Sequence, residues 1–222
     1  MVYNINMNIY PSILETSIEG FESTFLKELP HFSYFQIDIS DGEFVEKKTV
    51  EIHEVHNILT NHLELLIDKS FEFHLMVKDV SHYLNELTLL QNISIKRVLF
   101  PIQYPPEFHD YKNPLGFVLN PEDTVEDYWE TISKSNMESI QIMTVHPGSQ
   151  GQPFMPECLN KIDVLRERGF TGSIILDGCI NNRTLPIILQ NKHLPTDVCP
   201  GSYFKADTAN HLQILQELIR NA

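Results

Sequence analysis

The sequence predicts an α/β protein folded as a (β/α)8 barrel, and three observations favour this fold. Eight short apolar runs alternate with helix-like segments along the 222 residues. The runs lack the polar alternation of half-exposed strands, which is typical of a parallel sheet covered by helices. Several runs end in a polar residue, as expected where parallel strands meet at the mouth of a barrel. Eight repeats of one unit favour a closed barrel over an open sheet.

Each expected strand is an apolar or β-branched run that stops at a turn signal. An open, doubly wound sheet is the alternative, but it would need a glycine-rich turn after the first strand, and residues 12–15 read SILE. The expected strands are residues 9–14, 34–39, 71–77, 97–102, 115–119, 139–145, 173–176 and 197–199.

Helix-like segments with apolar residues on one face separate these strands. No low-complexity tract or Gly/Ser linker interrupts the order, so residues 1–222 are expected to form one domain. The weakest part is 103–113, rich in proline and aromatic residues, where one more helix would be needed. The expected helices are residues 17–29, 49–63, 81–90, 125–133, 156–168, 181–189 and 207–220.

Composition restricts the classes of partner. The formal charge is −14 and no Lys/Arg cluster interrupts it, which argues against nucleic acid and anionic membrane surfaces. The first ten residues have no basic segment and no long apolar run follows, so neither a signal peptide nor a membrane span is expected. Three scattered cysteines favour reduced thiols over a disulfide framework. We therefore expect a cytoplasmic protein.

Two acids and a histidine lie within or at the end of buried runs: Asp38, Asp177 and His74. A buried carboxylate is costly unless it is paired, bound to metal or used chemically. In a barrel the carboxyl ends of the strands converge, so these side chains are expected to share one centre. The bland alternatives are helix-capping acids and a core histidine. The polar residues expected at strand ends are Ser12, Asp38, His74, Asn120, His146, Asp177 and Ser202.

Five sequence motifs occur in one order along the chain. They are PSIL at 11–14, DISDGxFV at 38–45, HLMV at 74–77, MTVHPGxxGQxF at 143–154 and LDG at 176–178. With these motifs the chain resembles the ribulose-phosphate 3-epimerase family from residue 9 to the C-terminus. Residues 152–157 and 177–181 look nearest to the branch acting on allulose 6-phosphate.

The resemblance implies a ribulose-phosphate-binding barrel with one divalent metal ion, usually zinc or iron(II), held by two histidines and two aspartates. Asp38 and Asp177 would be both metal ligands and the acid/base pair, with His74 as the third ligand. The fourth position is Gln36, where the family has histidine. An amide oxygen is a harder and weaker donor than imidazole, so the site is expected to hold zinc less tightly, to prefer manganese, magnesium or iron, or to stay empty.

The resemblance also implies a phosphosugar pocket and a homo-oligomer. Glycines after the sixth to eighth strands let backbone N–H groups approach an anion, so no lysine is required. Cys179 and Pro200 reduce the glycine content there, and Pro200 supplies no N–H. Ser40 stands where the family has methionine. The expected substrate-binding residues are Ser12, Met76, Met143, Gly148, Ser149, Gln150, Gly151, Gly178, Cys179, Gly201 and Ser202.

The expected function is a metal-dependent ketose-phosphate 3-epimerase. Inverting a carbon beside a ketone requires a group on each face of the sugar and stabilisation of an enediolate. Ribulose 5-phosphate and a hexulose 6-phosphate are both left open, as are the metal and the pathway. The alternative is a phosphosugar-binding barrel that has lost catalysis at Gln36. Related decarboxylases and aldolases rank last, because their Asp-x-Lys-x-x-Asp pattern is absent at residues 38–41.

Overall fold

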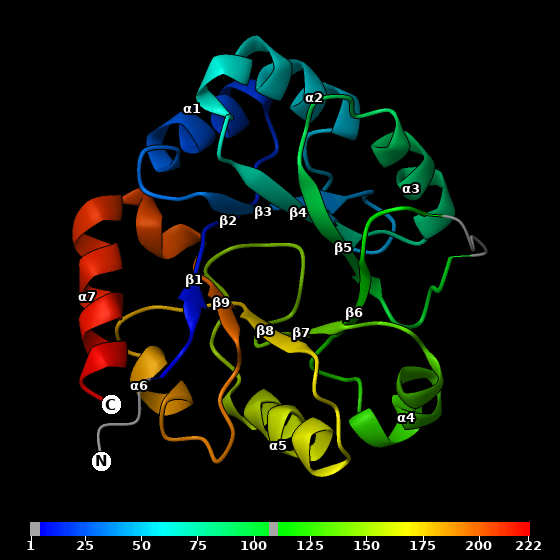
Figure 1. Cartoon of the computed structure of the whole chain (residues 1–222), viewed down its shortest axis with the longest axis vertical. Coiled ribbons are helices and arrows are strands. Elements are labelled where there is room, and N and C mark those ends of the chain that lie inside the picture. The colour runs from blue at the N-terminus through cyan, green and yellow to red at the C-terminus, as the bar shows by residue number, and fades with distance from the viewer. Residues whose placement is uncertain (1–4, 107–110) are drawn as a thin grey trace.

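The computed structural model describes residues 5–106 and 111–222. Within these residues nine strands form one sheet in which every pairing is parallel (Figure 1). The strands are β1 (Asn8–Ile9), β2 (Ser12–Ile13), β3 (Tyr34–Ser40), β4 (Ser70–Met76), β5 (Ile95–Pro101), β6 (Leu115–Leu119), β7 (Ser139–Met143), β8 (Ser173–Asp177) and β9 (Asp197–Cys199).

The sheet closes on itself through the first predicted strand, which is split into β1 and β2. β1 pairs with β9, and β2 pairs with β3. Between them, the Tyr10 N–H donates to the Val198 carbonyl at 3.3 Å, and Pro11 accepts from the Gln36 N–H at 2.9 Å. Proline has no N–H to continue the ladder, which explains the interruption. The split strand makes eight strand positions around a ring, and the predicted (β/α)8 barrel is confirmed.

Helices surround the sheet, and each follows a strand in the chain (Figure 1). Side chains of Ser17, Asp79, Thr124 and Asp207 accept an N–H from the first turn of the helix that follows, which explains where four helices begin. The helices are α1 (Ile18–Glu28), α2 (Ile52–Asn61), α3 (Val80–Thr88), α4 (Val125–Lys134), α5 (Asn160–Glu167), α6 (Leu185–Ile188) and α7 (Thr208–Arg220), with 3-10 turns η1 (Leu63–Leu65), η2 (Pro156–Leu159) and η3 (Ser202–Lys205).

One predicted helix was wrong in extent, and the weakest part of the expected pattern has no helix in its described residues. The segment predicted as a helix over 181–189 forms only the four-residue α6. The residues before α6 form a turn in which the Asn181 side chain accepts the N–H groups of Arg183 and Thr184, and Pro186 lacks the N–H that a helix beginning at 181 would need there. The described parts of 103–113, which are 103–106 and 111–113, contain no helix; residues 107–110 lie outside the described residues.

Alternation along β3 separates the core from the site. Phe35, Ile37 and Ile39 are buried on the outer face, where Phe35 packs against Phe25 of α1 with ring centroids 5.5 Å apart. The intervening residues of β3, Gln36 among them, point into the barrel. Apolar contact with the helices therefore fixes the strand register, and the register decides which polar groups meet inside.

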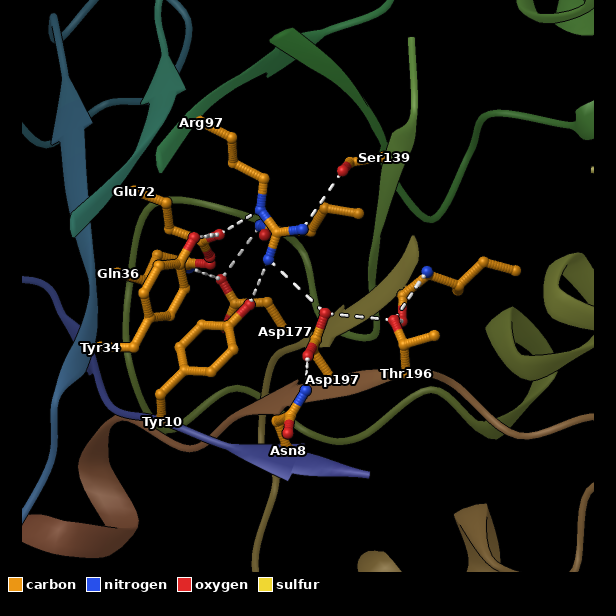
Figure 2. A network of polar contacts seen from close by, with 12 residues as sticks. Asn8, Tyr10, Tyr34, Gln36, Glu72, Arg97, Ser139, Asp177, Thr196 and Asp197 are labelled. Carbon is orange, nitrogen blue, oxygen red and sulfur yellow. Dashed lines mark hydrogen bonds and ion pairs between the residues drawn. The ribbon is translucent and has the colours of Figure 1, made fainter. Parts of the chain in front are cut away.

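The amino-terminal half of the barrel interior is polar and is organised around Arg97 of β5 (Figure 2). The guanidinium donates to Glu72, to the Tyr10 hydroxyl at 2.8 Å and to the Ser139 hydroxyl at 3.2 Å, and lies 3.5 Å from Asp197. Glu72 is completely buried, and burial raises the pKa of its carboxyl. This buried ion pair occupies the layer directly beneath the predicted site.

None of the helices in the described ranges has the length and apolar character needed to cross a membrane.

Candidate active site

A cavity of about 340 Å³ opens at the carboxyl ends of the strands. Every predicted site residue except Gln36 lines it. Gln36 lies below the cavity floor and is completely buried. The predicted residues that line the cavity are Ser12, Asp38, His74, Met76, Met143, Gly148, Ser149, Gln150, Gly151, Asp177, Gly178, Cys179, Gly201 and Ser202.

Asp38, His74 and Asp177 form one buried cluster at the cavity floor. They come from β3, β4 and β8, and their potential ligand atoms all lie within 4.8 Å of one another. Asp38 and His74 are register partners on adjacent strands, whereas Asp177 reaches the cluster from the other side of β2. The exposed fractions of Asp38, His74 and Asp177 are 4%, 1% and 7%, so bulk water does not screen their charges.

Hydrogen bonds hold the cluster together. The Gln36 amide donates from Nε2 to Asp38 Oδ1 at 3.0 Å and to Asp177 Oδ2 at 2.7 Å. His74 Nδ1 lies 3.0 Å from Asp38 Oδ1 and 3.6 Å from Asp177 Oδ2. The Ser12 hydroxyl donates to Asp38 Oδ2 at 2.5 Å. The two carboxylates are therefore bridged by both an amide and an imidazole.

The environment shifts two pKa values in the cluster. Burial by itself lowers the pKa of His74, but interactions with Asp177 and Asp38 outweigh it and raise the pKa to about 9. Burial raises the pKa of Asp177; bonds from His74 and Gln36 oppose this rise, and repulsion from Asp38 adds to it. The two carboxylates thus favour a proton on the ring nitrogen that faces them, and a metal ion would compete with that proton for the nitrogen.

The donor set fits a divalent cation. It offers two carboxylates and one imidazole within a single small cluster, which suits zinc, iron(II), manganese or magnesium. Gln36 Oε1 is buried and has no hydrogen-bond partner among the described residues. Rotating that amide by half a turn exchanges its nitrogen and oxygen, which would direct an oxygen ligand toward the carboxylates. The role of Gln36 as fourth ligand stays a prediction.

Two of the glycines expected to bind the phosphate, in the loops after β7 and β8, have backbone conformations that explain why glycine occupies these positions. Gly148 and Gly178 have φ of 100° and 117°. A Cβ at Gly178 would lie 2.7 Å from a methyl of Val145, and one at Gly148 would lie 2.7 Å from Val45. Cys179 adopts φ of 53° although it is not glycine, a conformation that costs free energy in a side-chain-bearing residue. These loops bring backbone close to the cavity.

The sequence did not predict several residues that line the cavity; among those in the described ranges, Arg183 alone has a permanent positive charge. Arg183 follows the Gly178 turn by five positions. Neither an apolar run nor a glycine motif marks position 183, so the sequence pattern does not indicate that this side chain reaches the cavity. His146, expected among the polar residues at strand ends, lies in the loop after β7; it is exposed, lines the cavity and lies 3.8 Å from Glu122.

The closed barrel carries a buried carboxylate–histidine cluster at its strand ends, and the sequence relatives place it in the class of isomerases that act as epimerases. The chain belongs to the ribulose-phosphate 3-epimerase family, whose sequence model matches residues 8–193. The predicted resemblance is thereby confirmed at the level of the family. The nearness to the allulose branch stays a prediction.

Individual relatives agree with this assignment. The chain is 31% identical over 163 residues to the ribulose-phosphate 3-epimerase of Methanocaldococcus jannaschii, covering 71% of this chain and 67% of that one. It is 28% identical over 191 residues to that of Schizosaccharomyces pombe, covering 82% and 80%.

Solved structures match the fold. KGPDC from Streptococcus mutans superposes with a TM-score of 0.68 at 12% identity, covering 98% of this chain and 99% of that one. The 3-hexulose-6-phosphate synthase of Salmonella typhimurium gives 0.65 at 12% identity, covering 97% and 99%.

Proposed function

We propose that this protein interconverts ribulose 5-phosphate and its C3 epimer, xylulose 5-phosphate. The observation that carries the proposal is the pair of buried carboxylates, Asp38 and Asp177, held in one cluster at the floor of a cavity. Epimerisation at C3 needs one group to remove a proton and a second to return one to the opposite face. The sequence relatives are named ribulose-phosphate 3-epimerases, which supports the choice of a pentulose phosphate as substrate.

Asp38 and Asp177 exchange the C3 proton, and the direction of reaction decides which of them acts as base. The Ser12 hydroxyl and the Gln36 amide hold the two carboxylates in place. His74, Asp38, Asp177 and Gln36 would hold a divalent cation. When bound, it supplies Lewis-acid stabilisation of the negative charge that develops on the sugar oxygens. Backbone N–H groups after β7, β8 and β9 bind the phosphate.

The activity is tested with ribulose 5-phosphate in deuterated buffer. Purified protein, supplied in turn with zinc, iron(II), manganese and magnesium, is expected to produce xylulose 5-phosphate and to place deuterium at C3, as followed by NMR. Chelator is expected to abolish the reaction. The proposal would be contradicted if the C3 proton did not exchange with any of the four metals.

A hexulose 6-phosphate is the finer alternative substrate. Allulose 6-phosphate and fructose 6-phosphate are tested in the same assay. A ratio of kcat/KM favouring the hexulose pair would assign the allulose branch.

A catalytically degenerate phosphosugar-binding barrel is the second candidate. The observation in its favour is the Gln36 amide, which bridges both carboxylates where the resemblance places a histidine ligand. Calorimetric binding of ribulose 5-phosphate without any C3 exchange would support it.

Under either function we propose that residues 1–222 form a single domain, that the protein is a homo-oligomer and that it is located in the cytoplasm. A relative from rice is named as a cytoplasmic isoform, which supports this location.

Arg183→Ala is expected to raise KM for the phosphosugar about tenfold and to leave kcat within a factor of three. Arg183 lines the cavity beside the phosphate loops, and a charge-assisted contact to a phosphate is worth roughly 1.5–3 kcal/mol. Steady-state kinetics measure the split between KM and kcat. Arg168→Ala is the control, since Arg168 pairs with Glu126 away from the cavity. An unchanged KM in Arg183→Ala would exclude this contact.

A further inference from the structure

We propose that Gln36 is a two-position amide. Without an ion, its NH2 group cross-links Asp38 and Asp177; with an ion, its oxygen faces the ion and its NH2 group turns to Glu72. The inference rests on the metal centre of the proposed function but not on turnover. It explains how a glutamine can occupy this position of the site.

The first step is the need for a bridge. Two carboxylates lie in one buried cluster, so without a donor between them they would repel each other and lose their hydration. The Gln36 amide has two N–H bonds, and Nε2 lies within hydrogen-bond distance of one oxygen from each carboxylate. Gln36 is completely buried, so bulk water has no direct access to take its place. The amide therefore cross-links the two carboxylates in addition to the imidazole of His74.

The second step concerns two unpartnered oxygens. Gln36 Oε1 and Glu72 Oε1 are both buried without a hydrogen-bond partner among the described residues. Gln36 and Glu72 are register partners on β3 and β4, and Figure 2 shows both side chains in the barrel interior. Half a turn of the amide gives its oxygen to the cluster and offers an N–H to Glu72. Both unpartnered oxygens then have a function.

The third step is the fixed position of Glu72. Its other oxygen, Oε2, accepts from Arg97 Nε and from the Tyr34 hydroxyl, the latter at 3.0 Å. These bonds hold the carboxylate in one orientation and leave Oε1 free. Glu72 is therefore a positioning residue that stabilises the ion-facing orientation of Gln36.

The test compares thermal unfolding in chelator with unfolding in saturating Zn²⁺. In chelator, Gln36→Leu is expected to unfold at least ~5 °C below the parent protein, because the cross-link is lost. The matched control is Gln141→Leu: Gln141 is equally buried and donates to Asp177 at 3.3 Å, but it has no bond to Asp38. The unfolding temperature of Gln141→Leu in chelator is expected to fall by less than half of the decrease seen in Gln36→Leu.

Gln36→His covers the case in which the leucine variant does not fold. A ring nitrogen of histidine carries at most one N–H, whereas the amide nitrogen of Gln36 carries two, so a histidine at position 36 cannot donate a separate hydrogen bond to each carboxylate from one nitrogen. This variant is expected to be less stable than the parent in chelator and to gain more from Zn²⁺. Equal unfolding temperatures of the parent and Gln36→His in chelator would overturn the cross-link.

Rotation of the amide is observed directly by NMR. The side-chain NH2 signals of Gln36, assigned by their loss in Gln36→His, are expected to shift on titration with Zn²⁺ while those of Gln141 shift less. Zn²⁺ binding by calorimetry with unmoved Gln36 signals would overturn the rotation. Neither measurement uses turnover. An inactive protein that shows both effects would therefore refute the proposed function alone, whereas an active one that shows neither would refute this inference alone.

Discussion

Asp38→Asn and Asp177→Asn are each expected to lower kcat for epimerisation by about 10³-fold, the largest effect on activity that we predict. An asparagine preserves the shape of the side chain but neither accepts nor donates the C3 proton. Both residues lie at the floor of the cavity and take part in the same cluster. Without either carboxylate, proton transfer at C3 is possible on only one face of the sugar, so inversion stops.

Isotope exchange separates this role from a loss of structure. In deuterated buffer each variant is expected to exchange the C3 proton of one epimer only, and the two variants are expected to prefer opposite epimers. Asp163→Asn is the control: Asp163 bonds Asn191 and His193 outside the cavity, and kcat should change less than twofold. Either site variant keeping a tenth of the parent kcat would contradict the assignment.

Arg97→Met is expected to lower the free energy of unfolding by about 3–5 kcal/mol, the largest effect on stability. The substitution leaves Glu72 completely buried without its cation and removes the cation beside Asp197 as well. The magnitude follows from the desolvation of an unpaired carboxylate rather than from the strength of the pair itself. Urea denaturation at pH 7 measures the change.

The double variant Glu72→Met/Arg97→Met tests that reason. It is expected to recover most of the lost stability, because replacing Glu72 together with Arg97 removes the buried carboxylate that would otherwise be left unpaired. Lys192→Met is the comparison at the surface, where Lys192 and Glu167 pair with 64% and 55% of their side chains exposed. That change should cost less than about 1 kcal/mol. A double variant as unstable as Arg97→Met would show that packing, not charge, explains the loss.

Local sequence determined the order of strands and most helices, because each depends on neighbours within a few positions. The apolar run 34–39 specifies β3 by β-propensity and burial, and Ser17 specifies the start of α1 by its side-chain cap. Local chemistry also explains the failure at 181–189, because Pro186 has no N–H to donate to the carbonyl four residues earlier and is favoured in the first turn of a helix, so the helix begins only at Leu185. The hydrophobic pattern by itself does not contain this signal.

The candidate site could be assembled in advance only as far as strand ends were recognisable. Asp38, His74 and Asp177 each interrupt or close an apolar run, so the meeting of strand ends in a barrel predicted their proximity. Arg183 carries no such signal, since it lies in a turn whose direction depends on the surrounding loops. Its place in the cavity became visible only in the folded chain.

The sequence by itself thus determined a (β/α)8 barrel, the family resemblance and the three residues of the cluster. The tertiary structure alone decided that the Gln36 amide joins two carboxylates and that Arg97 neutralises Glu72 beneath them. The physical reason is range: Gln36 and Asp177 are 141 positions apart. Barrel closure and strand register bring them within hydrogen-bond distance, and both depend on the packing of the whole chain.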